Sequence, residues 1–209
     1  EDNEYDIPEG MFEDLPEIEY GGTEIRILVE GDYRLNYKSV EICEHEDSPT
    51  TLNESILTRN GYVESRFDVK ITETYTTDSL PMKQIITQAV ASTSQDYDII
   101  MPYVPDAANM ALSNYLVLLN DQPNIHLDAP CWDQNARKSL SVNNKNYFLV
   151  GDANLLALGC THAIIFNKDL IKELNLENPY DLVKSGNWTV DKLKEMATIA
   201  TANIDGNSD

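Results

Sequence analysis

The sequence predicts an α/β fold built on a parallel sheet with helices on its faces. Three short apolar runs, residues 24–30, 69–75 and 97–101, are separated by two segments with helical periodicity. Strand, helix, strand, helix, strand at this spacing is a βαβαβ unit, which folds as a right-handed parallel sheet. The 209 residues are enough for one full domain or two small lobes.

The first strand and helix are marked by β-branched residues and by a capping pattern. Residues Glu24–Glu30 read EIRILVE and follow two glycines, which predicts a buried strand. Thr51 with Glu54 three residues later matches a capping box. The helix that follows carries Ile56, Val63 and Phe67 on one face, and Asn60-Gly61 weakens its middle without ending it.

The second strand, residues 69–75, alternates in polarity. Val69, Ile71 and Glu73 share one face, opposite Lys70, Thr72 and Thr74. Asp78 and Pro81 then mark a helix start, and an apolar face follows at Met82, Ile85, Ile86 and Ala89.

The rest of the chain is predicted from shorter signals. Tyr97–Met101 is the third strand and Pro102 stops it. Helices are expected over 106–113 and 130–140, strands over 147–150 and 163–166, and helical structure from Asp169 onward. Thr189 is a good N-cap, with Trp188 and Leu193 placed as a hydrophobic staple.

Charge excludes several classes of partner. Fifteen Lys and Arg against 36 Asp and Glu give a net charge of −21. Such a field repels phosphate backbones and anionic lipid surfaces, so we expect no nucleic-acid partner. Residues 1–20 hold nine acidic residues and no basic one, which predicts an extended acidic leader.

Two sequence patterns suggest metal sites, and each has a plainer interpretation. Cys43-x-His45 and Cys160-x-His162 could form a Cys₂His₂ site, but structural zinc sites use longer, regular spacings, so buried cysteines and surface histidines explain them better. A weak candidate calcium loop spaces oxygen side chains at alternate positions, and a polar turn after a helix accounts for the same residues. We predict no cofactor and no metal beyond that candidate, whose residues are Asn203, Asp205, Asn207 and Asp209.

Four stretches together resemble the family 1 extracellular solute-binding proteins, the maltose-binding-protein-like sugar-binding lipoproteins of ABC importers. They are the strand at 24–30 with its loop, the segment YDIIM at 97–101, the block YFLVGD at 147–152 with AIIFNKDL at 163–170, and NWTVDKL at 187–193. Their order and spacing carry the resemblance, which covers residues 24–202. The proline usual in the third stretch is missing, with Val150 near its place.

The resemblance implies a periplasmic-binding-protein-like lobe with a parallel sheet flanked by helices, followed by a second lobe that has only begun. We therefore expect a flexible acidic leader over 1–22, a first α/β lobe over 23–165 and the start of a second, mostly helical lobe over 166–209. Family members are about twice this length in two hinged lobes, so we expect a fragment or a shortened relative.

Candidate ligand contacts follow from the geometry of open parallel sheets, which bind ligands beyond the carboxyl ends of their strands. Aromatic rings cover the apolar face of a sugar, and carboxylates accept its hydroxyl groups. Asp32 and Tyr33 follow the first strand, together with Glu30. Tyr103 and Asp106 follow the third strand. Two further candidates come from later in the chain, namely Trp132 and Asp152.

The functional expectation is non-covalent capture of an extracellular solute, a carbohydrate or oligosaccharide, for delivery to the membrane permease of an ABC importer. The protein would be cell-surface anchored or periplasmic, and would meet the membrane only through a lipid anchor. No G-x-S-x-G, H-E-x-x-H or P-loop motif is present, so we expect no enzyme. The alternative is an exported glycan-active hydrolase or adhesion module.

Overall fold

The computed structural model describes residues 15–31, 38–46, 48–77, 80–159 and 161–201. The chain divides into two compact units, Glu1–Thr161 and His162–Asp209. Each unit is described by itself.

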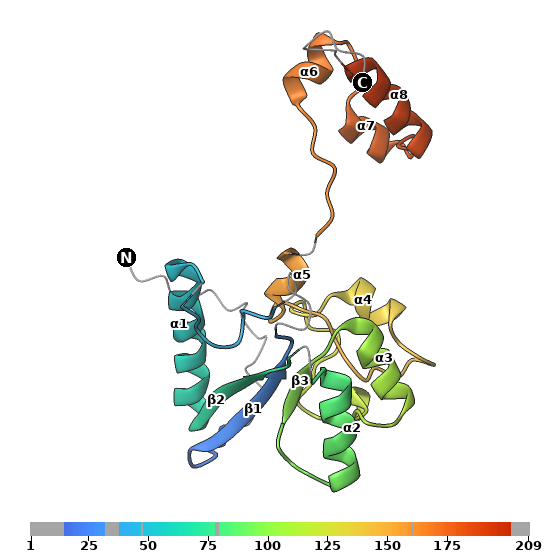
Figure 1. Cartoon of the computed structure of the whole chain (residues 1–209). Coiled ribbons are helices and arrows are strands. Elements are labelled where there is room, and N and C mark those ends of the chain that lie inside the picture. The colour runs from blue at the N-terminus through green and yellow to red at the C-terminus, as the bar shows by residue number, and fades with distance from the viewer. Residues whose placement is uncertain (1–14, 32–37, 47, 78–79, 160, 202–209) are drawn as a thin grey trace. The chain divides into compact units, whose positions relative to one another are not determined.

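The first unit is built on a three-stranded parallel sheet. Strand β1 (Thr23–Val29) lies between β2 (Val69–Tyr75) and β3 (Ile99–Met101), so the order is β2-β1-β3 (Figure 1). The register pairs Val29 with Tyr75 on one side and with Met101 on the other, which brings the carboxyl ends of all three strands to one edge. The α/β class and the parallel sheet predicted from the sequence are confirmed.

Helices cover both faces of this sheet. Helix α1 (Thr50–Phe67) connects β1 to β2, and α2 (Met82–Ser92) connects β2 to β3. The first connection leads from β1 to β2 on one side of it, and the second leads from β2 across β1 to β3 on the other side. Connections of one hand then place their helices on opposite faces, as Figure 1 shows for α1 and α2.

The core has one apolar cluster on each face of the sheet. On one face Leu28 packs against Met82 and Ile86 of α2 and Met110 of α3 (Val104–Leu112). On the other face a second cluster forms around β1 and the segment that precedes α1, and its buried members are Ile27, Val29 and Ile42.

Helix α1 does not begin with the capping box expected at Thr51 and Glu54. Its N-cap is Pro49, without a side-chain hydrogen bond, and the carbonyl oxygen of Pro49 accepts from Leu52 and Asn53. Thr51 is therefore already inside the helix and does not cap it. Gly61 lies within the helix and does not end it, as expected.

Two predicted strands are wrong, and the helix expected over 130–140 begins later than predicted. Residues 147–150 and 163–166 are not strands; the pairing next to the first run is limited to one isolated bridge, between Trp132 and Gly151. Helix α4 is Gln134–Ser139, four residues shorter at its start than the predicted 130–140, because Asp133 caps it by accepting from the backbone N–H groups of Asn135 and Ala136. Two further short helices are η2 (Leu119–Asp121) and α5 (Leu155–Gly159).

The second unit is helical, as predicted from Asp169 onward. It contains α6 (Lys168–Glu173), α7 (Pro179–Lys184) and α8 (Val190–Ala200). Each helix is capped by an oxygen side chain that accepts backbone N–H groups, and the caps are Asn167, Asn178 and Thr189. The predicted cap at Thr189 is confirmed. Among the described helices, none is long and apolar enough to cross a bilayer.

An ion pair ties β1 to the chain just before β3. Arg26 bonds Asp98 through two guanidinium nitrogens, Nε and Nη2, each at 3.1 Å, and the backbone N–H of Arg26 donates to Asp98 Oδ2 at 2.9 Å. The side-chain hydrogen bonds from Arg26, and then its backbone N–H, hold the pKa of the Asp98 carboxyl below its ordinary value.

Asp98→Asn is expected to remove part of the acid sensitivity of folding. A carboxyl whose pKa is lowered in the folded state contributes stability above its unfolded pKa of about 3.9, and that stability is lost as the pH falls through the folded-state pKa. Urea unfolding of wild type and variant, from about pH 6 to about pH 2, measures this. Wild type should lose unfolding free energy more steeply than Asp98→Asn. Asp96→Asn, which leaves the Arg26–Asp98 bonds in place, is the matched control; equal slopes for wild type and Asp98→Asn would contradict the assignment.

Candidate ligand-binding site

The candidate site lies where β1 and β3 end, at the edge where open parallel sheets bind ligands. Glu30 directly follows β1 and is buried, with 7% of its surface exposed. The backbone N–H of Tyr103, just after β3, donates to Oε1 of Glu30 at 3.4 Å. The turn after β1 and the turn after β3 are therefore joined by one carboxylate.

The chain after β2 is tied to the same carboxylate. The hydroxyl of Thr76, a residue that is 1% exposed, donates to Oε2 of Glu30 at 3.2 Å and accepts the N–H of Gly31 at 2.9 Å. Gly31 allows this close approach, since a Cβ on it would lie 2.1 Å from the carbonyl oxygen of Thr76. All three strand ends thus meet in one hydrogen-bonded cluster, which we call the Glu30 clasp: Glu30, Gly31, Thr76 and the backbone N–H of Tyr103.

The directions of these hydrogen bonds assign the proton of the Thr76 hydroxyl. Its oxygen already accepts from Gly31, so its single proton is the one that reaches Glu30. Glu30 therefore accepts a hydrogen bond at each of its two oxygens. A carboxylate has about four acceptor positions, so the two bonds of the clasp leave further acceptor capacity at this edge.

Tyr103 and Asp106 both follow β3 at the start of α3, and the backbone N–H of Tyr103 belongs to the clasp. Tyr103 is the N-cap of α3, and 45% of its surface is exposed. Asp106 is half-buried in the first turn of that helix, where a negative charge is favourable near the helix N-terminus. An exposed aromatic ring and a carboxylate are thus held on the first turn of one helix.

Trp132 and Asp152 are brought together although they are far apart in sequence. Trp132 forms an isolated antiparallel bridge with Gly151, and the N–H of Asp152 donates to the carbonyl of Cys131 at 2.9 Å. A Cβ at Gly151 would lie 2.7 Å from the indole ring, so the ring packs directly on that backbone. Asp152 itself is exposed, and its charge contributes, after burial, to raising the pKa of the Cys131 thiol.

The remaining predicted site residues lie outside the described part of the chain. These are Asp32 and Tyr33 in the loop after β1, and the candidate calcium loop at Asn203, Asp205, Asn207 and Asp209. Cys160 of the alternative Cys₂His₂ site also lies outside it. Within the described ranges, no group of three His, Cys, Asp or Glu side chains is placed to hold a metal ion.

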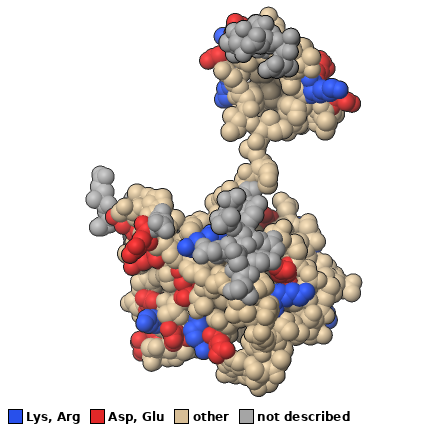
Figure 2. All heavy atoms as spheres, in the orientation of Figure 1, with Lys and Arg blue, Asp and Glu red and all other residues tan. Residues whose placement is uncertain are grey.

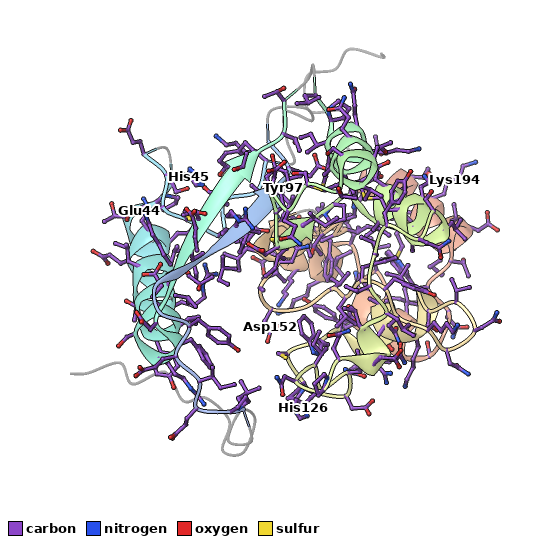
Figure 3. All side chains as sticks on the ribbon, turned by 90° about the horizontal axis from the view of Figure 1, so that it is seen from below. Glu44, His45, Tyr97, His126, Asp152 and Lys194 are labelled. Carbon is purple, nitrogen blue, oxygen red and sulfur yellow. The ribbon has the colours of Figure 1, made fainter. Side chains whose placement is uncertain are left out.

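A half-buried polar cluster beside β2 was not predicted from the sequence. Nε2 of His45 lies 2.9 Å from Oε1 of Glu73, and the N–H of Cys43 donates to Oε2 of Glu73 at 3.3 Å. Tyr75 contacts the His45 ring and donates its hydroxyl to the carbonyl of Ser39 at 2.9 Å. Figure 3 shows His45 on the α1 side of the sheet, well apart from Asp152. The signal was present in the sequence, because the alternation of β2 places charged Glu73 on the same face as Val69 and Ile71.

This cluster fastens the segment before α1 to the sheet. Burial, followed by the charge of Glu73, raises the pKa of the Cys43 thiol to about 11. The same two causes, in the same order, raise the pKa of the Tyr75 hydroxyl. Neither group ionises near neutral pH, so both serve the fold as neutral groups beside one buried carboxylate.

Surface charge on the first unit agrees with the overall composition. Figure 2 shows many carboxylates on the side where α1 lies. This distribution is unfavourable for a phosphate backbone.

The chain was compared with protein families, curated proteins and solved structures. No family model and no curated protein matches the chain. An ABC transporter solute-binding protein from Agrobacterium vitis S4, with bound D-mannitol, is similar at 15% sequence identity and a TM-score of 0.38. The match covers 85% of this chain and 37% of that protein, so the chain spans little more than a third of its length. The fold class rests on the sheet order and connections described above.

Proposed function

We propose that this chain captures an extracellular solute, a carbohydrate, and holds it non-covalently for the permease of an ABC importer. The observation that carries the proposal is the exposed Tyr103, whose backbone N–H belongs to the Glu30 clasp at the edge where β1 and β3 end. Doubly wound sheets bind ligands at this edge, and the order β2-β1-β3 places it between β1 and β3. The sequence resemblance to family 1 solute-binding proteins supports the same function.

The chemistry of the edge suits a solute rich in hydroxyl groups. Glu30 and Asp106 supply acceptors for hydroxyl donors, and the ring of Tyr103 offers a face for the C–H groups of a pyranose. Trp132 and Asp152 form a second aromatic and carboxylate pair in the same unit, and we propose them as further contacts. Asp32 and Tyr33 complete the proposed set. Binding would proceed by hinge closure of two lobes, and no bond of the solute would be made or broken.

The cellular setting follows from this proposal. A solute-capture protein works outside the cytoplasmic membrane, so we propose a periplasmic or cell-surface location. A lipid anchor would hold it at the surface, and its macromolecular partner would be the membrane permease.

Tyr103→Ala is expected to weaken sugar binding by roughly 1–2 kcal/mol without unfolding the domain, because it removes an exposed stacking surface. Calorimetric titration measures this with a panel of D-mannitol, D-glucose, D-xylose, maltose and cellobiose. The matched control is Tyr62→Ala, which removes a tyrosine of similar exposure, 53%, from α1. An unchanged dissociation constant in Tyr103→Ala would remove Tyr103 from the site. Release of new reducing ends from maltose or cellobiose would favour the alternative, a glycan-active hydrolase.

A further inference from the structure

We propose that Thr76 is a positioning residue for the solute site, acting through Glu30 on Tyr103. The inference rests on the proposed function, since it assigns to Thr76 a part in binding at the same edge. Thr76 follows β2, the strand of this sheet that contributes no residue to the predicted contact set. Thr76 would therefore contribute to the site only through the hydrogen bond that its hydroxyl donates to Glu30.

Thr76 is itself rigidly placed. Its backbone N–H donates to the carbonyl of Val29 at 3.0 Å, which continues the ladder between β1 and β2 past the last paired residues. Its side chain is 1% exposed, and its hydroxyl is held by Gly31 on one side and Glu30 on the other. The hydroxyl therefore has one orientation available within the clasp.

Glu30 links Thr76 to the turn after β3 through its two carboxylate oxygens. A glutamate side chain has several rotatable bonds, so a carboxylate held at one oxygen only can swing away from its second partner. Thr76 fixes Oε2, and Oε1 is then in place for the N–H of Tyr103. Helix α3 has no side-chain cap of its own, and the backbone N–H of its N-cap residue is held by Glu30 instead.

The consequence is a defined position for the backbone that carries the aromatic ring. Tyr103 is where the chain turns from β3 into α3, and its backbone is joined through Glu30 and Thr76 to the end of β2. Ligand sites gain affinity when the contacting groups are ordered before binding, because less entropy is lost on association. Thr76 would thus raise affinity without touching the solute.

The test is a double-mutant cycle with a rescue variant. Thr76→Val keeps the shape of the side chain and removes the hydroxyl, whereas Thr76→Ser keeps the hydroxyl. Affinities for maltose and D-mannitol are measured by titration of the isotopically labelled full chain. We expect Thr76→Val to weaken binding about 5- to 10-fold and Thr76→Ser to stay within about 2-fold of wild type. In a Tyr103→Ala background, Thr76→Val should cause no further loss.

Amide hydrogen exchange supplies a readout that needs no ligand. We expect the amide of Tyr103 to exchange about 10-fold faster in Thr76→Val than in wild type, with Thr76→Ser restoring protection and amides at the centre of β1 unchanged. Equal protection of Tyr103 in wild type and Thr76→Val would overturn the inference, as would additive losses in the cycle or failure of Thr76→Ser to restore binding. If wild type binds neither sugar while the exchange result holds, the proposed sugar binding falls and the Glu30 clasp stands as a structural device only.

Discussion

We expect Leu28→Ala to lower the free energy of unfolding by about 3–4 kcal/mol. This loss is a large share of the stability of a small domain. Leu28 lies in the central strand with none of its surface exposed, and it packs against α2 and α3. Truncation removes the contacts of Leu28 with Met82 of α2 and Met110 of α3. It leaves a cavity between the sheet and these two helices. Urea unfolding monitored by circular dichroism measures the loss.

The control for this variant is an exposed leucine of the same unit. Leu112, in the last turn of α3, keeps 75% of its surface exposed, so Leu112→Ala should change the unfolding free energy by less than about 0.5 kcal/mol. If the two variants lost similar stability, Leu28 would not be the centre of the core and the packing of α2 and α3 on the sheet would be wrong.

Gly31→Ala is expected to cost about 3 kcal/mol, and to distort the Glu30 clasp in any molecules that remain folded. A Cβ there would lie 2.1 Å from the carbonyl oxygen of Thr76 and 2.9 Å from the Cβ of Tyr75. The first is a backbone atom of the neighbouring strand end, so relief requires β1 and β2 to separate where they finish. Thermal and urea unfolding of the variant measure the cost.

Gly61→Ala separates this steric effect from the general effect of replacing a glycine. Gly61 lies inside α1, where a Cβ would meet nothing within 4 Å. Alanine is the better helix former by up to about 1 kcal/mol, so this variant should be as stable as wild type or more stable. A destabilised Gly61→Ala, or a fully stable Gly31→Ala, would contradict the geometry.

The sheet could be predicted from sequence because its signals are local and strong. The β-branched run before Gly31 gives β1, the alternation from Val69 to Tyr75 gives β2, and helical periodicity between them gives α1. Local patterns of this kind fix element type more reliably than element ends. The start of α1 is an example: Thr51 and Glu54 have capping-box spacing, yet the N-cap is Pro49, two residues before Thr51.

The two wrong strands failed for a reason that lies outside their own residues. Residues 147–150 and 163–166 are apolar runs of strand length, but a strand also requires a neighbour with free backbone groups. At Val150 the carbonyl accepts from Asp133, the residue after Trp132, and the pairing ends at the single bridge between Trp132 and Gly151. Ile165, in the second run, is 93% exposed. The availability of a partner strand cannot be read from a local pattern.

Candidate site residues could be named from the sequence, but the hydrogen bonds that connect them could not. Counting past the strand ends indicated Tyr103 and the residues after β1, since parallel strands end at one edge. Thr76 could not be assigned in this way, because its importance comes from a hydrogen bond to Glu30 that joins the ends of β2 and β1. Side-chain bonds between distant segments depend on the folded geometry, and sequence spacing does not encode them.

The measurement that tests the central claim most directly is a nuclear magnetic resonance titration of the isotopically labelled chain with D-mannitol, D-glucose, D-xylose, maltose and cellobiose. We expect at least one sugar to cause saturable amide shifts concentrated at Gly31, Tyr103 and Asp106, with the sugar recovered intact afterwards. Shifts absent with every sugar, or confined to the exposed surface of α1, would contradict a sugar-binding site at the carboxyl edge of the sheet.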